Sequence, residues 1–379
     1  MLATPPLSLY IHIPWCVRKC PYCDFNSHEA PAAIPENDYI DVLLDDFDRD
    51  YSECGSREIV SIFMGGGTPS LFSGAGFDRI LGHLRRHGNL AQDIEVTMEA
   101  NPGTAEASKF SDFKAAGINR LSLGIQSFDD KSLTLLGRIH DGKQSRLAIE
   151  TALGAGFDNF NLDLMHGLPN QTQSDALSDL TAAISYHPTH LSWYQLTIEP
   201  NTAFYRRPPT LPLEDVLRGI QLSGEDMLFQ HGFNQYEISA FATENRQSRH
   251  NLNYWKFGDY IGIGAGAHGK ISFPASNTII RTRKHKQPNH YIKNTVDHTA
   301  QRLIVGEDEK VLEFMMNALR LKDGFSICEF EDHSGQAFSA IAKQVDSLSE
   351  SGLLHQLNQK IRATEKGYHF LNNLLEEFL

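Results

Sequence analysis

The sequence lacks any long apolar run. A transmembrane helix needs roughly 20 consecutive apolar residues, and no stretch of the 379-residue chain approaches that length. The N-terminus also lacks the basic region of a secretory signal peptide, and Pro5 and Pro6 precede only a short apolar segment. We therefore expect a cytoplasmic protein without a transmembrane segment. Transient contact with membrane proteins is compatible with that expectation.

Positive charge is also scarce. Lysine and arginine number 34 against 47 aspartate and glutamate residues, which gives a formal net charge of −13. Such a balance argues against non-specific binding to nucleic acid or to an anionic membrane surface. The hydrophobic content of 41% is ordinary for a globular protein, and the length suits one large and one small domain.

Cysteine is the third scarce residue type, and its distribution is uneven. An odd count of five cysteines does not fit a disulfide framework, and a reducing compartment fits best. Three of them, Cys16, Cys20 and Cys23, follow an apolar segment as C-x3-C-x2-C. We interpret Cys54 and Cys328, which stand alone, as structural or surface residues.

Three thiolates this close together can converge on one metal centre. Zinc usually takes four ligands, and His28 would complete a Cys3His site. An iron–sulfur cluster normally has four thiolate ligands, so three thiolates on a four-iron cluster would leave one iron open for another ligand. Both centres are compatible with the spacing alone.

Short apolar segments alternate with amphipathic helical stretches as far as Pro200. The expected strands are 7–13, 59–64, 94–98, 120–125, 159–164 and 191–196. The expected helices are 37–51, 77–87, 105–116, 143–155 and 173–186. Because each parallel crossover needs room for a helix, these units predict an α/β fold with a parallel sheet. Six units favour a partial TIM-like barrel over a doubly wound open sheet.

Polar residues and glycines follow these strands, at the end where barrels of this kind carry their chemistry. The turn GGGTP, residues 65–69, lets the backbone approach a ligand closely and resembles a helix start. Glu99, Gln126 and Asp163 end or nearly end three later strands, and Arg138 would add a partner for a carboxylate. Their convergence on one mouth predicts a site for a polar ligand.

Two later motifs admit more than one interpretation. HNLNYW, residues 250–255, joins a histidine to two aromatic residues, which suits either a hydrogen-bonded corner or a haem site. Tyr254 and Trp255 could then cover part of a porphyrin face. GIGAGAHG, residues 262–269, imitates a dinucleotide motif, but the basic run 281–286 stands where an acidic residue would be needed, so we reject that site. We expect the run 281–286 to be a solvated loop, with an anion contact as the alternative.

The alternation changes near residue 309. Segments 310–321 and 336–349 have helical patterns, 352–363 resembles a hairpin, and 365–378 a closing helix. This order is similar to a small winged-helix domain, but acidic residues outnumber basic ones there, which disfavours DNA binding. We therefore expect a barrel region over 1–286, a linker over 287–308 and a helical, winged-helix-like domain over 309–379.

The cysteine spacing, with Tyr22 directly before the last cysteine, resembles the cluster loop of radical S-adenosylmethionine (radical SAM) proteins. The segments YIHIPWC, GGGTPS, EANPGT, NLDLMHGLP and HNLNYW extend the resemblance along nearly the whole chain. They are similar to the group that contains oxygen-independent coproporphyrinogen III oxidases and related haem chaperones. The family's core implies a partial (β/α)6 TIM-like radical SAM barrel.

The resemblance also implies roles for individual residues. Cys16, Cys20 and Cys23 would ligate a 4Fe–4S cluster, and His250 would bind haem. The residues that would contact S-adenosylmethionine are Tyr10, Tyr22, Gly66, Gly67, Thr68, Glu99, Gln126, Arg138 and Asp163.

One departure from the family pattern bears on function. In the oxidases the cysteine loop continues to a further cysteine, and Phe25 stands at that position here. HNLNYW, in contrast, is associated with the haem chaperones. We therefore expect a chaperone that delivers haem to haem-accepting proteins, and we assign no catalytic residue. The alternative is an enzyme that decarboxylates the propionates of coproporphyrinogen III by radical chemistry.

Overall fold

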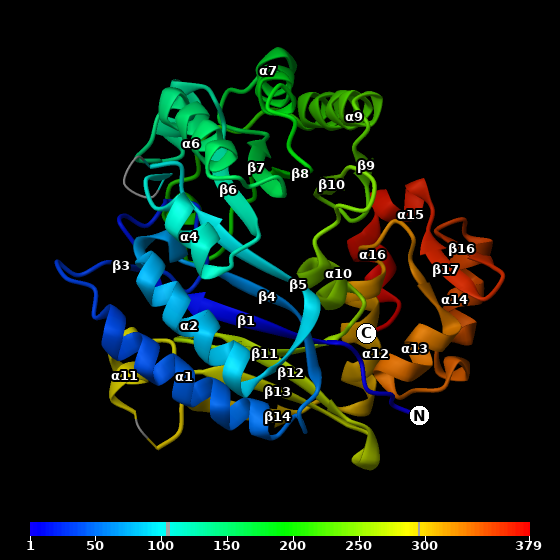
Figure 1. Ribbon diagram of the computed structural model, residues 1–379. Coiled ribbons are helices and arrows are strands. Elements are labelled where there is room, and N and C mark those ends of the chain that lie inside the picture. The colour runs from blue at the N-terminus through cyan, green and yellow to red at the C-terminus, as the bar shows by residue number, and fades with distance from the viewer. Residues whose placement is uncertain (104–106, 295) are drawn as a thin grey trace.

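Parallel strands form the centre of a 12-stranded sheet in the computed structural model, which describes residues 1–103, 107–294 and 296–379 (Figure 1). In spatial order these strands are β11 (Asp259–Ile263), β1 (Leu7–Ile13), β4 (Glu58–Gly66), β5 (Asn89–Ala100), β6 (Arg120–Gln126), β7 (Phe160–His166) and β8 (His190–Gln195). All six expected strands are present. A seventh parallel strand, β11, comes from much later in the chain and pairs with β1.

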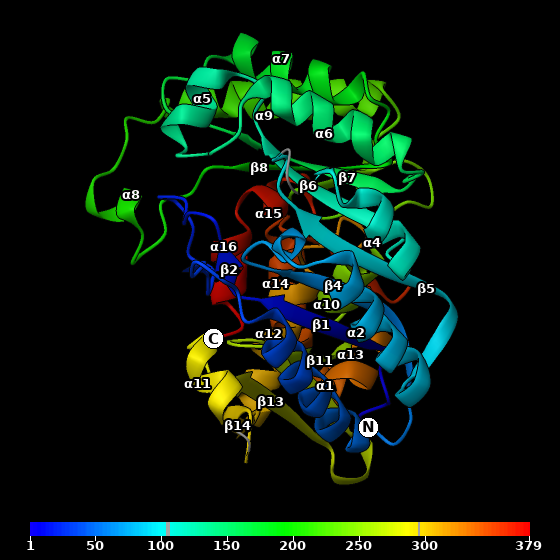
Figure 2. The same ribbon diagram turned by 60° about the vertical axis from the view of Figure 1, so that its left-hand side comes forward.

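Helices connect consecutive parallel strands and cover one face of the sheet (Figures 1 and 2). They are α1 (Glu36–Ser52), α2 (Gly74–His87), α4 (Phe110–Ala116), α5 (Asp130–Leu135), α6 (Gly142–Gly154) and α7 (Gln173–Ile184). The expected helix 105–116 is confirmed from Phe110 onward, and its first two positions lie outside the described residues. The partial (β/α)6 barrel is therefore confirmed.

Side chains alternate between the two faces of each strand. In β1, Leu9 and Ile11 are fully buried in the main apolar core, on the face covered by helices. Ser8 and Tyr10 belong to the other face, where Ser8 Oγ lies 2.8 Å from Ser61 Oγ and Tyr10 Oη lies 3.0 Å from Nδ1 of His12. The concave face of the barrel is therefore polar.

Three antiparallel strands extend the sheet beyond β11, namely β12 (His268–Phe273), β13 (Thr278–Lys284) and β14 (Thr299–Ile304). The basic run 281–286 was expected to be a solvated loop, and that prediction is wrong, because most of it forms β13. Two of its cations are paired: Lys284 Nζ lies 2.6 Å from Asp46, and Arg281 lies 2.6 Å from Glu313.

The stretch 287–308 was expected to be a linker, and its described residues include regular elements at the sheet edge. It contains α11 (Pro288–Lys293) and β14, which pairs with β13. At the opposite edge, β10 (Ala240–Ala242) pairs with β8, and β9 (Asn234–Gln235) pairs with β10. The helices α8 (Ala203–Arg206), α9 (Glu214–Gln230) and α10 (Arg249–Trp255) lie in the segment between β8 and β11.

The C-terminal region lies on the side of the sheet opposite α1 and α2 (Figures 1 and 2). It contains α12 (Glu307–Ala318), β15 (Phe325–Ser326), α13 (Ile327–Ser334), α14 (Ala342–Glu350), β16 (Leu354–Leu357), β17 (Lys360–Ala363), α15 (Glu365–His369) and α16 (Leu371–Glu376). The expected hairpin is confirmed as β16 and β17. The sequence did not reveal α13, and the expected closing helix is interrupted at Phe370. Phe257 and Ile279 join the apolar core of this region.

The buried pair of Lys284 and Asp46 yields a stability prediction. Both side chains are 1% exposed, so Lys284→Met should leave a buried carboxylate without its cation and lower the free energy of unfolding by about 3–5 kcal/mol. Arg302→Met is the matched control, because the pair of Arg302 with Glu53 is 47% and 46% exposed and should contribute only about 0–1 kcal/mol. Urea unfolding of both variants measures the difference, and equal losses would contradict it.

Candidate functional site

A cavity of about 290 Å³ opens where the parallel strands end. The expected site residues that line it are Cys16, Cys20, Tyr22, Cys23, Gly66, Gly67, Thr68, Glu99, Gln126, Arg138 and Asp163. Two of the expected residues, Tyr10 and His250, do not line it. The fold thus brings together residues that are far apart in the sequence, as the strand-end argument predicted.

The cysteine loop lies across one side of this mouth. It begins at β2 (Trp15–Cys16), which pairs with β3 (His28–Glu29), and the backbone N–H of Thr68 donates to the carbonyl of Trp15 at 2.7 Å. The thiols are free, and burial raises the pKa of Cys16. The loop is therefore anchored to the glycine turn beside it.

The spread of the thiols disfavours a single zinc ion. Four sulfur atoms around one zinc lie about 3.8 Å apart, given Zn–S bonds of about 2.3 Å. Within residues 1–103, 107–294 and 296–379, the cysteines do not form a group whose ligand atoms all lie within 4.8 Å of one another. His28 does not line the cavity. A larger multi-iron centre fits this loop better than the Cys3His alternative.

The glycine turn after β4 leaves no room for side chains. Gly66 has φ of +108°, and a Cβ there would lie 2.3 Å from the ring of His12; a Cβ on Gly67 would lie 2.6 Å from the carbonyl oxygen of Trp15. Thr68 precedes a short 3-10 turn, and its hydroxyl accepts a hydrogen bond from Asn101 at 2.9 Å instead of capping that turn. A ligand can therefore approach this backbone closely.

Two carboxyl groups, Glu99 and Asp163, face the cavity; among the described residues neither forms an ion pair, although the charge of Arg120 acts on Asp163. Burial, and secondly the charge of Asp163, raises the pKa of Glu99 to about 8. Burial likewise raises the pKa of Asp163, which accepts hydrogen bonds from Ser122 and Asn161. The backbone N–H of Gly66 donates to Glu99 at 3.2 Å. A ligand with an ammonium group would supply the missing positive charge and fits this end of the cavity.

Gln126 and Arg138 are held by residues that sequence reasoning missed. Gln126 has φ of +67°, and its side-chain oxygen accepts from the hydroxyl of Tyr194 at 2.7 Å. Arg138 donates to Asn101 at 2.6 Å and lies 3.5 Å from the sulfur of Cys20. The two-residue period of a strand could have identified Asn101. It lies two residues beyond Glu99, so the two side chains are expected on the same face.

Exposed apolar side chains form the rim of the mouth. Val17, Phe25 and Ile139 line the cavity and are 53%, 65% and 50% exposed. Phe25 therefore presents an apolar ring at the position where the oxidases carry a further cysteine.

His250 lies away from the mouth, on α10. Its ring stacks on Phe63 at 5.1 Å, and its Nδ1 lies 3.3 Å from the hydroxyl of Ser61, near the start of β4. Glu95 accepts from the backbone N–H of His250 at 3.3 Å. Burial, assisted by Arg120, lowers the pKa of His250 to about 3, so its imidazole is neutral at physiological pH.

The aromatic residues of HNLNYW have other partners. The guanidinium of Arg320, from the C-terminal region, lies 4.4 Å from the ring of Trp255, and Tyr254 packs against Tyr260 at 5.3 Å. Trp255 therefore joins α10 to the C-terminal region. The motif GIGAGAHG forms a turn from β11 to β12, not the strand–turn–helix of a dinucleotide site.

Comparison with known proteins gives concordant results. The family model of the radical SAM superfamily matches residues 10–182, and that of the HemN C-terminal domain matches residues 305–370. The chain is 49% identical to a protein of Escherichia coli (strain K12) called heme chaperone HemW, over 379 residues and 100% of both chains. It is 48% identical to the protein of the same name from Haemophilus influenzae, covering 99% of this chain and 98% of that one.

A solved structure of coproporphyrinogen III oxidase (HemN) from Escherichia coli has the same fold. Its TM-score is 0.82 at 22% sequence identity, covering 99% of this chain and 90% of that chain. Among the described residues, no helix is long and apolar enough to cross a membrane.

The geometry of the mouth predicts which cysteines matter for iron. Cys16→Ala, Cys20→Ala and Cys23→Ala should each abolish iron and sulfide binding after anaerobic reconstitution, because only these thiols face the cavity. Cys54→Ala and Cys328→Ala are the controls, since Cys54 is buried against α1 and Cys328 bonds to Asp332 at 3.2 Å. Zinc without iron in the reconstituted wild type would contradict the prediction.

Proposed function

The chain belongs to the radical SAM superfamily, within the group of the HemW proteins, and on that premise we propose that it is a cytoplasmic haem chaperone. It binds haem and delivers it to haem-requiring proteins. The observation that carries the proposal is the 49% identity, over the full length of both chains, to a protein called heme chaperone HemW. The radical SAM family implies a 4Fe–4S cluster and S-adenosylmethionine, and the donor set at the mouth fits both.

In this proposal Cys16, Cys20 and Cys23 hold the cluster. A cluster held by these cysteines would supply one-electron redox chemistry. Glu99 and Asp163 receive the ligand's ammonium group, because they are carboxyl groups that line the cavity and neither forms an ion pair among the described residues.

The other expected contacts differ in how directly they reach the ligand. Tyr22, Gly66, Gly67, Thr68, Gln126 and Arg138 line the cavity and can contact S-adenosylmethionine there. Tyr10 bonds to His12 and does not line the cavity. Its role is therefore to hold the ring of His12, against which Gly66 packs.

His250 is the residue that we propose for haem. Its neutral imidazole suits haem iron, and Ser61 fixes the ring through Nδ1, which leaves Nε2 as the ligand atom. The ring lies against Phe63 and near Tyr10, which are aromatic side chains that a bound macrocycle would meet.

Substitution of His250 tests the haem site. His250→Ala should weaken haem binding and alter the Soret band, while iron and sulfide content stay unchanged, because α10 lies away from the cluster loop. His268→Ala is the matched control, since His268 is an exposed histidine whose pKa is also lowered. Unaltered affinity and spectrum in His250→Ala would remove this residue from the proposal, and loss of iron together with haem would indicate unfolding.

Turnover separates the chaperone from an oxidase. We expect no conversion of coproporphyrinogen III to protoporphyrinogen IX under strict reduction, because Phe25 stands where the oxidases carry a further cysteine. Cluster-free Cys20→Ala protein provides the background rate. Conversion by the wild type above that background would favour the enzyme.

A further inference from the structure

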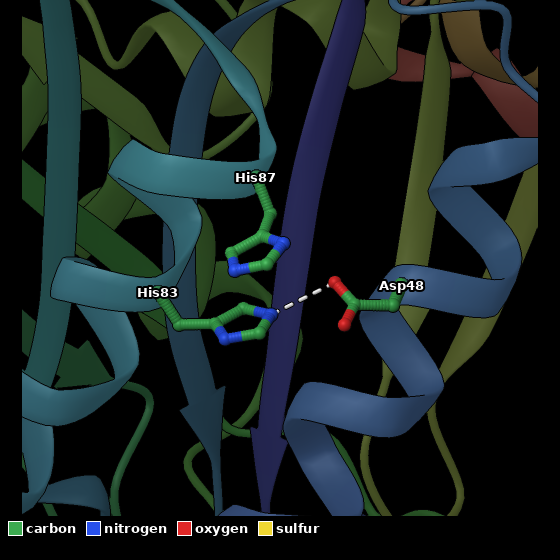
Figure 3. A group of neighbouring side chains, drawn as sticks. All are labelled: Asp48, His83 and His87. Carbon is green, nitrogen blue, oxygen red and sulfur yellow. Dashed lines mark hydrogen bonds and ion pairs between the residues drawn. The ribbon is translucent and has the colours of Figure 1, made fainter.

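Three potential metal ligands converge on the outer surface of the barrel, where α1 and α2 pack together (Figure 3). One ligand atom each from Asp48, His83 and His87 lies within 4.8 Å of the other two. Across the part of the chain that the structure describes, no other trio of histidine, cysteine or acidic side chains meets this criterion. The proposed haem and S-adenosylmethionine sites do not use these residues.

The two histidines are one helical turn apart on α2, so their side chains point the same way. Their rings stack nearly parallel, with centroids 4.0 Å apart and an angle of 8° between planes. His83 Nε2 lies 2.8 Å from Oδ1 of Asp48, which reaches across from α1 (Figure 3). The backbone thus already positions two imidazoles and a carboxylate around one point.

The carboxylate of Asp48 can interact with a bound cation. Asp41 and Asp45, on the same helix as Asp48, form ion pairs with Arg79 and Arg49 respectively. Asp48, in contrast, is paired with His83. Its side chain is 44% exposed, so an ion can reach it from solvent.

We propose that Asp48, His83 and His87 form a zinc-binding site that bridges α1 and α2. Two imidazoles and a carboxylate suit zinc, whereas calcium and magnesium prefer sites made of oxygen ligands. Three protein ligands leave a fourth tetrahedral position for water. The ion thus adds a metal link between two helices that also meet through side-chain packing, the Asp41–Arg79 ion pair and the Glu36–Ser73 hydrogen bonds.

Binding requires only small rearrangements. His83 Nε2 faces Asp48, so the ring ligates zinc as the tautomer that carries its proton on Nδ1 and gives the Nε2 lone pair to the ion. Zinc–ligand bonds of about 2.0–2.1 Å place tetrahedral ligands about 3.3 Å apart, so the 2.8 Å contact between His83 and Asp48 must widen by roughly 0.5 Å.

The site lies at the far end of these helices from the barrel mouth. Near the mouth, Glu36 at the start of α1 accepts hydrogen bonds from Ser73, the N-cap of α2. Asp48 is 12 residues further along α1, roughly 18 Å at 1.5 Å per residue. A zinc ion there holds α1 to α2 and does not involve the cluster cysteines.

The test is a zinc titration of the cluster-loaded protein by anaerobic calorimetry, because cysteines that hold iron do not compete for zinc. Wild type should bind one zinc ion per chain. The double variant His83→Gln/His87→Gln should lose this one-per-chain binding step. Removing the supporting partner of a ligand lowers metal affinity by roughly 10–100-fold, and removing two ligands themselves should lower it further. Asp48→Asn should weaken the step, and zinc should raise the Tm of wild type but not of the double variant.

The chain offers a matched control in a second histidine pair, His285 and His290, whose ring centroids lie 4.3 Å apart. His285→Gln/His290→Gln should bind zinc as wild type does. Iron content and the haem spectrum should be unchanged in every variant, which separates this site from the haem proposal. The zinc site is refuted if the His83/His87 double variant retains the one-per-chain step, or if only the control variant loses it.

Discussion

The structure depends on hydrogen-bond and charge partners for the polar side chains that face the inside of the barrel. Strand alternation sends every second side chain into the barrel, where burial raises the pKa of Glu99. Burial also lowers the pKa of His250, which α10 places against Phe63 of β4. Hydrogen bonds satisfy much of this interior, as where His190 bonds to Asn161 at 2.7 Å and to Tyr236 at 2.8 Å. At the mouth, Glu99 and Asp163 are buried carboxyl groups without an ion-pair partner among the described residues, and the proposed ligand site depends on this feature.

The opposite end of the barrel interior is closed by α10. Glu95, in β5, accepts from the first backbone N–H groups of this helix, and Asn253 donates to Ser8 at 2.9 Å. His250 contacts β4 near Ser61, five residues before Gly66, so the proposed haem ligand and the mouth are roughly 16 Å apart along the strand. In the proposed chaperone, haem and S-adenosylmethionine therefore occupy different ends of one barrel, which suits a protein that carries haem without altering its side chains.

Buried ion pairs fix the added strands to this barrel, and a partly exposed pair joins the C-terminal region to them. Asp259 in β11 contacts Lys270 at 2.9 Å and Arg57 at 2.7 Å, and the Asp46–Lys284 pair fastens β13 to α1. The acidic helix α1 thus has contacts on two faces. Its Asp46 contacts the sheet edge, and its Asp48 contacts α2. The Arg281–Glu313 pair then connects β13 to α12.

The sequence by itself determined the order of the six strand–helix units, because hydrophobic period and helix length are local properties. It also determined the cysteine loop and the polar strand ends, since parallel strands present their carboxyl ends at one edge. Only the tertiary structure decided which elements the basic run 281–286 and the described residues of 287–308 form. Their charges and polar residues look solvent-exposed until distant acids such as Asp46 neutralise them. The helical state of HNLNYW and the meeting of Asp48 with His83 likewise depend on packing between segments far apart in the chain, which no local pattern encodes.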